Sequence, residues 1–286
     1  MATSSPTALK WWIALELTKL RERAGLSRQQ VADHLQCALS TVRHVEIGRN
    51  LPRPLELREM LTLYGIPERV EQFNELLTSA KKGRDWFEAF AGAAPAWFDL
   101  FLGLESSAAQ IESYDALVIP GLFQTAAYAE AVIRAGNPEL SDTEVSRRIE
   151  LRLARQEVLT RDPEPPTVWS VLDESALYRS IGDTAAMREQ LTHLVNLAQL
   201  PTVTIQMLPM AAGPHVGING TFVMFEFADL TGNPTVAYTD GMIAGAYYER
   251  PDQLRKYRNA LTRLQITAAK PAESVAMITQ RAQELS

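Results

Sequence analysis

Residues 25–52 read GLSRQQVADHLQCALSTVRHVEIGRNLP, and this pattern predicts two short helices joined by a tight turn. Ser27 and Gln30 have the spacing of a capping box, in which the serine hydroxyl accepts the Gln30 N–H and the glutamine side chain accepts the Ser27 N–H. The predicted helices span 28–35 and 39–47. A glycine stands just beyond the second helix, where helices commonly end.

The second of these helices, 39–47, has two different faces. Val42 and Val45 are three residues apart and indicate the side that packs on the rest of the domain. The opposite side is polar and carries Ser40, Thr41, Arg43 and His44. A capped helix, a short turn and a second helix with a polar outer face are typical of the helix-turn-helix, which places its second helix in the major groove of DNA.

Amphipathic periodicity predicts three more helices around this pair. They span 8–23, 55–63 and 67–81. Gly25 lies just past the first of them, and Pro54 suits the first turn of the next. The region 1–82 is therefore expected to form an all-α domain of five helices.

This region resembles the XRE-type, or lambda-repressor-like, helix-turn-helix domain over about residues 8–80. Three segments carry the resemblance: GLSRQQVADHL, STVRHVEIGRNLPRP and LREMLTLYGI. Two positions depart from the family pattern. Gln36 stands where members usually have a turn glycine, and Ala38 stands where they usually have a Ser or Thr cap, whose loss costs about 1 kcal/mol.

The resemblance implies how the domain meets DNA. Residues at the start of the second motif helix are expected to reach base edges: Leu39, Ser40, Arg43 and His44. Others are expected to contact phosphates: Arg28, Thr41, Arg49 and Arg53. Arg43 has the donor geometry for a guanine, whereas Leu39 suits only a thymine methyl. In the alternative interpretation these side chains are merely solvated, and Glu46 pairs with Arg43 or Arg49.

The charge of the chain is unevenly distributed. Its 286 residues carry a net charge of −6, yet residues 1–82 have 12 Lys and Arg against 9 Asp and Glu, and 83–286 have 16 against 25. A mildly basic region 1–82 (the head) followed by an acidic region 83–286 suits DNA binding by the first region, although a charge difference this small also arises by chance. Cys37 is the only cysteine, which predicts a reducing, cytoplasmic setting. Neither a signal peptide nor a membrane span is expected, because no apolar run approaches the roughly 20 residues that a bilayer requires.

Beyond residue 82 the pattern changes. Residues 83–110 are rich in aromatic side chains and predict a helical connector. From 111 to 286 strand and helix patterns alternate, which predicts a larger α+β domain. The expected strands are 113–119, 165–173, 201–209, 221–227, 234–240 and 243–249, and the expected helices are 122–135, 141–161, 185–199, 253–266 and 274–284.

This second region resembles the Scr-type antitoxin-like regulators, an actinobacterial group that includes WhiJ-like developmental regulators. The segments IPGLFQTAAYAEAVI, LDESALYRSIG and LPMAAGPHVGINGTF carry the resemblance, and P-G-L-x-Q-T is the most distinctive piece. It covers about residues 95–284. The resemblance implies that the domain binds a small partner protein encoded nearby, which modulates DNA binding.

The sequence contains no pattern typical of catalysis. None of its four histidines, His34, His44, His193 and His215, stands in an H-E-x-x-H motif, and one cysteine excludes thiolate zinc clusters. The segment 213–220 lacks the G-K-[ST] of a phosphate loop, so His215 is expected to be a turn residue. Asp173 and Glu174 are expected to begin a helix. We therefore expect no enzyme activity, cofactor or metal.

These features predict a sequence-specific transcriptional regulator of double-stranded DNA. A homodimer is expected, because one head covers little DNA surface and specific binding usually needs two half-sites. Two alternatives stay open. In one, the main role is antitoxin-like sequestration of a small protein with autoregulatory operator binding. In the other, the α+β domain senses a small molecule.

Overall fold

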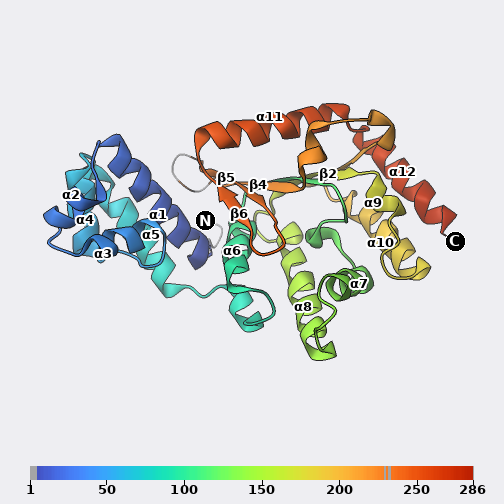
Figure 1. Ribbon diagram of the computed structural model, residues 1–286, viewed down its shortest axis with the longest axis horizontal. Helices are drawn as coiled ribbons and strands as arrows, with labels where there is room; N and C mark the ends of the chain where they lie inside the picture. Colours follow the sequence, from blue (N-terminus) through green and yellow to red (C-terminus); the bar gives the residue numbers. More distant parts are fainter. Residues whose placement is uncertain (1–4, 229, 231–232, 286) are drawn as a thin grey trace. The chain divides into compact units, whose positions relative to one another are not determined.

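The computed structural model describes residues 5–228, 230 and 233–285 (Figure 1). The chain divides into two compact units. The first unit contains the described residues up to Glu88 together with Asp99–Ser107, and the second contains Ala89–Phe98 and the residues from Ala108 onward. The first is helical and the second combines helices with a mixed sheet, so the predicted fold class is confirmed.

The helices of the first unit follow the predicted pattern closely. They are α1 (Pro6–Arg23), α2 (Arg28–His34), α3 (Leu39–Glu46), α4 (Pro54–Leu63), α5 (Val70–Lys82) and α6 (Asp99–Ser107). The predicted fifth helix begins instead with a separate 3-10 turn, Pro67–Arg69. A further 3-10 turn, Trp86–Phe90, follows α5. The last helix, α6, comes from the stretch interpreted as a connector, and it packs against α1.

Large apolar side chains fill the core of this unit. Trp12, Leu17, Leu57 and Phe73 are each at most 1% exposed. The Trp12 and Phe73 ring centroids lie 5.4 Å apart, which joins α1 to α5. Burial of each such side chain stabilises the fold by roughly 1.5–3 kcal/mol. The unit is therefore held by packing between helices distant in sequence.

A six-stranded sheet forms the centre of the second unit. Its strands are β1 (Gln110–Asp115), β2 (Thr167–Asp173), β3 (Val203–Leu208), β4 (Phe222–Glu226), β5 (Thr235–Thr239) and β6 (Ala246–Tyr248). Their order is β3-β2-β1-β4-β5-β6. The first three are parallel to one another, and β4, β5 and β6 each pair antiparallel with the preceding neighbour. The parallel half arises because helices connect β1 to β2 and β2 to β3.

Helices cover this sheet on both faces. They are α7 (Ala126–Gly136), α8 (Asp142–Arg155), α9 (Ser175–Tyr178), α10 (Thr184–Leu197), α11 (Pro251–Thr267) and α12 (Pro271–Glu284). Figure 1 shows α11 on one face and α7 and α8 on the other. The chain between α11 and α12 also protects the β3 edge. The Met207 N–H donates to Ser274 Oγ of α12 at 2.8 Å, and the Ala269 N–H donates to the Met207 carbonyl at 2.9 Å, so both backbone groups of Met207 are satisfied at this edge.

One predicted strand is misplaced. The strand expected over 113–119 begins three residues earlier and ends at Asp115. The Ala116 N–H donates to the Thr221 hydroxyl at 3.1 Å instead of to a strand. Pro120 has no N–H and restricts the residue before it. The apolar run therefore continues past the strand as a turn, in which Ile119 is fully covered while Leu117 is 60% exposed.

Candidate nucleic-acid interface

The turn between α2 and α3 sets the relation of the two motif helices. The predicted capping box is present: Ser27 Oγ accepts the Gln30 N–H at 3.2 Å, and Gln30 Oε1 accepts the Ser27 N–H at 2.8 Å. Gln36 has φ 51°, the left-handed conformation that glycine adopts most easily. Ala38 starts α3 without a side-chain cap. The turn and the start of α3 thus form without a glycine and without a hydroxyl cap.

Helix α3 presents the two faces expected from the sequence. Val42 and Val45 are buried at 1% and 5% exposure. Ser40 and Arg43 are exposed, and Leu39 is 46% exposed at the first position of the helix. His44 and Thr41 are half-buried. The outer face at the start of α3 therefore combines one apolar, one hydroxyl and one guanidinium group.

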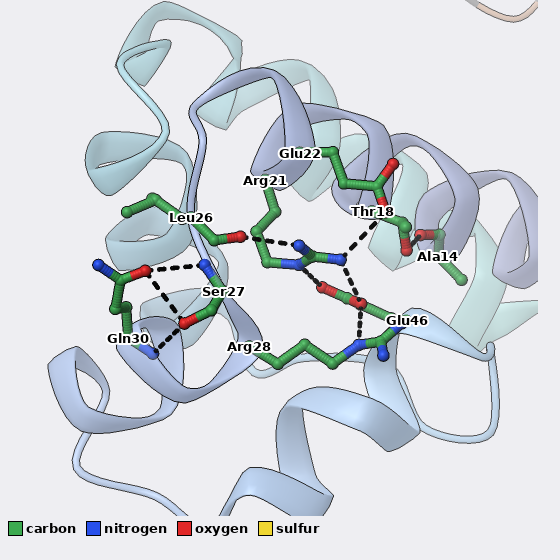
Figure 2. A network of polar contacts seen from close by, with 9 residues as sticks. All are labelled: Ala14, Thr18, Arg21, Glu22, Leu26, Ser27, Arg28, Gln30 and Glu46. Atoms are coloured by element: carbon green, nitrogen blue, oxygen red, sulfur yellow. Dashed lines mark hydrogen bonds and ion pairs between the residues drawn. The ribbon is translucent and has the colours of Figure 1, made fainter.

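A buried ion network ties α3 to the two preceding helices (Figure 2). The Glu46 carboxylate is fully covered and accepts from Arg21 Nε at 2.5 Å and from Arg28 Nε at 2.6 Å. Arg21 Nη1 also donates to the Leu26 carbonyl at 2.8 Å. The hydrogen bond to Glu46 raises the pKa of Arg21 further above its ordinary value. The alternative interpretation, in which Glu46 pairs with Arg43 or Arg49, is wrong, because Glu46 faces inward and bonds to Arg21 and Arg28.

The residues expected at phosphates differ in their surroundings. Arg28 is bonded to Glu46 through Nε, yet its side chain is 45% exposed. Arg49 is exposed, and its Nη1 lies 3.5 Å from His44 Nε2. Arg53 is 81% exposed and pairs with Glu56, with 2.6 Å between Nη2 and Oε1. The hydrogen bond from Arg53 lowers the pKa of Glu56 below its ordinary value.

Sequence reasoning missed the Arg21–Glu46–Arg28 network. A signal for it was present, because Glu46 follows Val42 by four residues and therefore lies on the same, buried face of α3. A carboxylate on a buried face requires cationic or hydrogen-bonding partners. Arg21, on the apolar side of α1, is the partner that the same periodicity indicates.

The second unit carries a polar cluster where β1 and β2 end. The Tyr114 hydroxyl lies 3.4 Å from Asp173 Oδ2, and His215 Nε2 lies 3.7 Å from the same oxygen. His215 Nδ1 accepts the Gly217 N–H, and Glu174 accepts the Met210 N–H at 2.7 Å. His215 thus does more than form a turn, and Glu174 stands at the start of the short helix α9 as expected. Across the described parts of both units, no three His, Cys, Asp or Glu side chains are grouped as metal ligands.

Comparison with known proteins adds a family to this description. Residues 98–280 match the family described as a domain of unknown function (DUF5753). The chain belongs to the DUF5753 family. The DUF5753 domain includes α6 and the whole sheet, and residues 12–73 before it match a helix-turn-helix domain. Neither a curated protein nor a solved structure matches the chain. The helix-turn-helix match supports a DNA-binding regulator, and no helix in the described residues is long and apolar enough to cross a membrane.

Proposed function

We propose that this DUF5753 protein is a sequence-specific transcriptional regulator, which reads its operator with the start of α3 and binds a small partner protein through its C-terminal domain. The observation that carries the DNA-reading role is the outer face of α3. Val42 and Val45 anchor the helix from inside, while Ser40 and Arg43 stand exposed at its beginning. Residues at that end of a recognition helix contact base edges.

The structure supports different roles for the eight predicted DNA-binding residues. Arg43 is the donor best suited to a guanine, and Leu39, Ser40 and His44 complete the base-reading set. For the phosphates we propose Arg28, Thr41, Arg49 and Arg53. Arg28 is the first residue of α2, and its Nε donates to Glu46. This bond holds the Arg28 guanidinium in one orientation before DNA is bound. An oriented cation loses less conformational entropy when it meets a phosphate.

The base-reading role is tested on Arg43. Operators are first selected from random duplexes with the full chain. Arg43→Ala should then reduce the ratio of specific to non-specific affinity by roughly 1–3 kcal/mol, because that is the discrimination of a bidentate arginine–guanine pair. Arg58→Ala is the control, since Arg58 is an exposed arginine on α4 outside the proposed interface. An unchanged ratio in Arg43→Ala would refute the assignment.

The phosphate role is tested on Arg49. Arg49→Ala should weaken binding to operator and scrambled duplexes alike, and reduce the slope of log affinity against log salt by about one unit. Affinity measured over a series of salt concentrations gives both quantities. An effect confined to the operator sequence would show that Arg49 reads bases instead.

We also propose that two copies bind together. A single head has too small a DNA surface for tight specific binding, so two heads on adjacent half-sites are expected. The selected operators should then contain two half-sites about one helical turn apart or a multiple of it. Selection of a single, unrepeated site would argue for a monomer.

Exposed apolar side chains support the partner-binding role. Met242 and Ile243, in the loop between β5 and β6, are 104% and 89% exposed, and adjacent exposed apolar residues commonly mark interaction sites. Met242→Ser with Ile243→Ser should weaken binding of the protein encoded next to this gene. Ile266→Ser is the control, since Ile266 is 79% exposed on α11. Binding unaffected by the double substitution would exclude this loop, and toxicity of the neighbour expressed alone would favour the antitoxin-like role.

A further inference from the structure

We propose that the second unit binds a small oxyanion, a phosphate or a carboxylate, at Arg152 on α8, where this helix meets the segment Pro120–Thr125. This site is independent of the DNA-binding surface proposed above. The segment contains the P-G-L-x-Q-T pattern, which the proposed function does not use. One of its residues, Gln124, bonds to the Arg152 guanidinium, with which no carboxylate of the described residues forms an ion pair.

Side chains from two helices fix this segment in place. Gln156 Nε2 donates to the Gln124 carbonyl at 2.5 Å, just after α8. Gln190 of α10 accepts the Thr125 N–H and donates to the Phe123 carbonyl, both at 2.7 Å. These bonds satisfy backbone groups that neither a helix nor a strand satisfies. The backbone of this segment is therefore fixed in place by side chains of other elements.

Gly121, the glycine of the pattern, allows Arg155 to approach this segment closely. A Cβ at position 121 would lie 3.1 Å from Arg155 Nη1, closer than ordinary contact. The Arg155 guanidinium also stacks over the Phe98 ring, 5.5 Å from its centroid. Gly121 thus leaves room for the Arg155 guanidinium. The P-G-L-x-Q-T segment is therefore packed against a positively charged side chain.

The central group of the site is Arg152. Its Nη1 donates to Gln124 Oε1 at 2.7 Å, and the other oriented group of that amide, Nε2, donates to the Ile119 carbonyl at 2.7 Å. Gln124 is neutral and offers no charge compensation. Among the residues that the structure describes, no carboxylate forms an ion pair with Arg152. A guanidinium has five N–H donors, and the described residues accept from Arg152 at Nη1, through Gln124.

The electrostatic surroundings favour an anion at this point. Burial lowers the pKa of Arg152 to about 10, and the positive charges of Arg155 and Arg148 act in the same direction. All three arginines lie on neighbouring turns of α8. The Asp240 carboxylate acts to raise the pKa of Arg152. Asp240 is exposed, however, and its Oδ1 already accepts from the Tyr238 hydroxyl and the Gly241 N–H.

Arg152 is half-buried, and a partly desolvated cation that pairs with no described carboxylate destabilises the unliganded fold. An anion that enters the site removes this cost. The planar fork of a guanidinium matches the two oxygens of a carboxylate or phosphate, which sets the class of ligand. Arg152 is therefore a binding group that reduces the stability of the empty protein.

The test measures Tm of the full chain in chloride, inorganic phosphate and citrate at equal ionic strength. For the unmodified chain, Tm should rise with the logarithm of the concentration of phosphate or citrate. Arg152→Gln should raise Tm in chloride by roughly 2–4 °C and abolish the response to both anions. Arg152→Lys keeps the charge without the fork and should respond weakly. Arg188→Gln, which removes an exposed arginine on α10, should leave the response unchanged.

The outcomes separate the possibilities. A response to phosphate alone identifies a phosphate ligand, and a response to citrate alone identifies a carboxylate. A lower Tm or a failure to fold for Arg152→Gln would overturn the proposal, because Arg152 would then be structural. Equal responses in the unmodified chain and Arg152→Gln, or no response in either, would overturn it as well. None of these results depends on DNA binding.

Discussion

Gln36 shows how a single residue can match a backbone poorly and still be tolerated. Its φ of 51° is left-handed, a conformation that costs a residue with a side chain about 1–2 kcal/mol. Glycine adopts it freely but loses more chain entropy on folding. Gln36→Gly should therefore stabilise the first unit by about 1 kcal/mol, whereas Gln36→Ala should bring no gain. Hydrogen exchange of the buried Val31 and Val42 amides measures this difference, and equal exchange in all three chains would contradict it.

Asp115 makes the stability of the second unit depend on pH. Burial raises its pKa to about 7, while a hydrogen bond from Ser113, 2.7 Å away, acts against that rise. Ser113 bonds in turn to Ser170. Because the pKa of Asp115 is higher in the folded protein than in the unfolded chain, folding favours the protonated carboxyl group. The stabilisation is complete below about pH 4 and is lost as the pH rises through 7.

The free energy of unfolding should accordingly fall between pH 5 and pH 8, by at most about 3 kcal/mol from this residue. Asp115→Asn keeps the shape without the charge, so its unfolding free energy should change less over the same interval. Urea unfolding of both proteins at the two pH values measures the contrast. Parallel pH profiles would mean that Asp115 titrates normally.

At the scale of elements, one carboxylate joins three helices. Glu46 of α3 bonds to Arg21 of α1 and Arg28 of α2. Removing one member of a buried pair leaves an uncompensated charge, which typically costs about 3–5 kcal/mol. Glu46→Gln should destabilise the first unit by an amount in this range. Arg28→Gln should cost less than about 1 kcal/mol, because the Arg28 side chain is 45% exposed.

The free energy of unfolding of the first unit is measured for both variants by hydrogen exchange of the Val42 amide in increasing urea. DNA binding should fall in both variants, since α3 loses its anchor in Glu46→Gln and a proposed phosphate contact is lost in Arg28→Gln, so the free energy of unfolding is the readout that separates them. Similar losses of stability in the two variants would show that exposure does not separate the two ion pairs. In that case the network would act as one unit.

At the scale of the whole molecule, the boundary between the two units does not follow the chain. Residues 89–98 belong to the second unit, and α6 returns to the first. Gly103 of α6 allows close approach to Thr7 of α1 and to Ser5, which caps that helix, and the Ser5 N–H donates to Ser107 Oγ at 2.8 Å. A helix-turn-helix fragment cut before α6 therefore lacks a structural part.

Three fragments test this division. Residues 1–107 should be more stable to urea than residues 1–88 by about 2–4 kcal/mol, because α6 buries apolar side chains such as Leu102 and Leu104. Residues 1–98 serve as the control for chain length and should resemble 1–88. Equal urea midpoints for all three fragments would show that α6 contributes nothing to the first unit.

Much of this fold was predictable because its signals are local. The capping box at Ser27 was expected and is present. The apolar periodicity of α3 identified Val42 and Val45 as buried. The errors lie where distant residues compete. The strand that ends at Asp115 was placed too late, and the only partners considered for Glu46 were Arg43 and Arg49, its near neighbours in sequence.

Local sequence signals were enough to predict most of the helices, the turn at Gln36 and the alternation of strands and helices, because caps, turns and periodicity depend on residues within about one or two helical turns. The strand order β3-β2-β1-β4-β5-β6, the return of α6 to the first unit and the charge partners of Glu46 emerge only in the folded molecule. Arg21 and Glu46 are 25 residues apart, and Arg152 and Gln124 are 28 residues apart. Such contacts arise from packing whole elements together, and no local pattern specifies them.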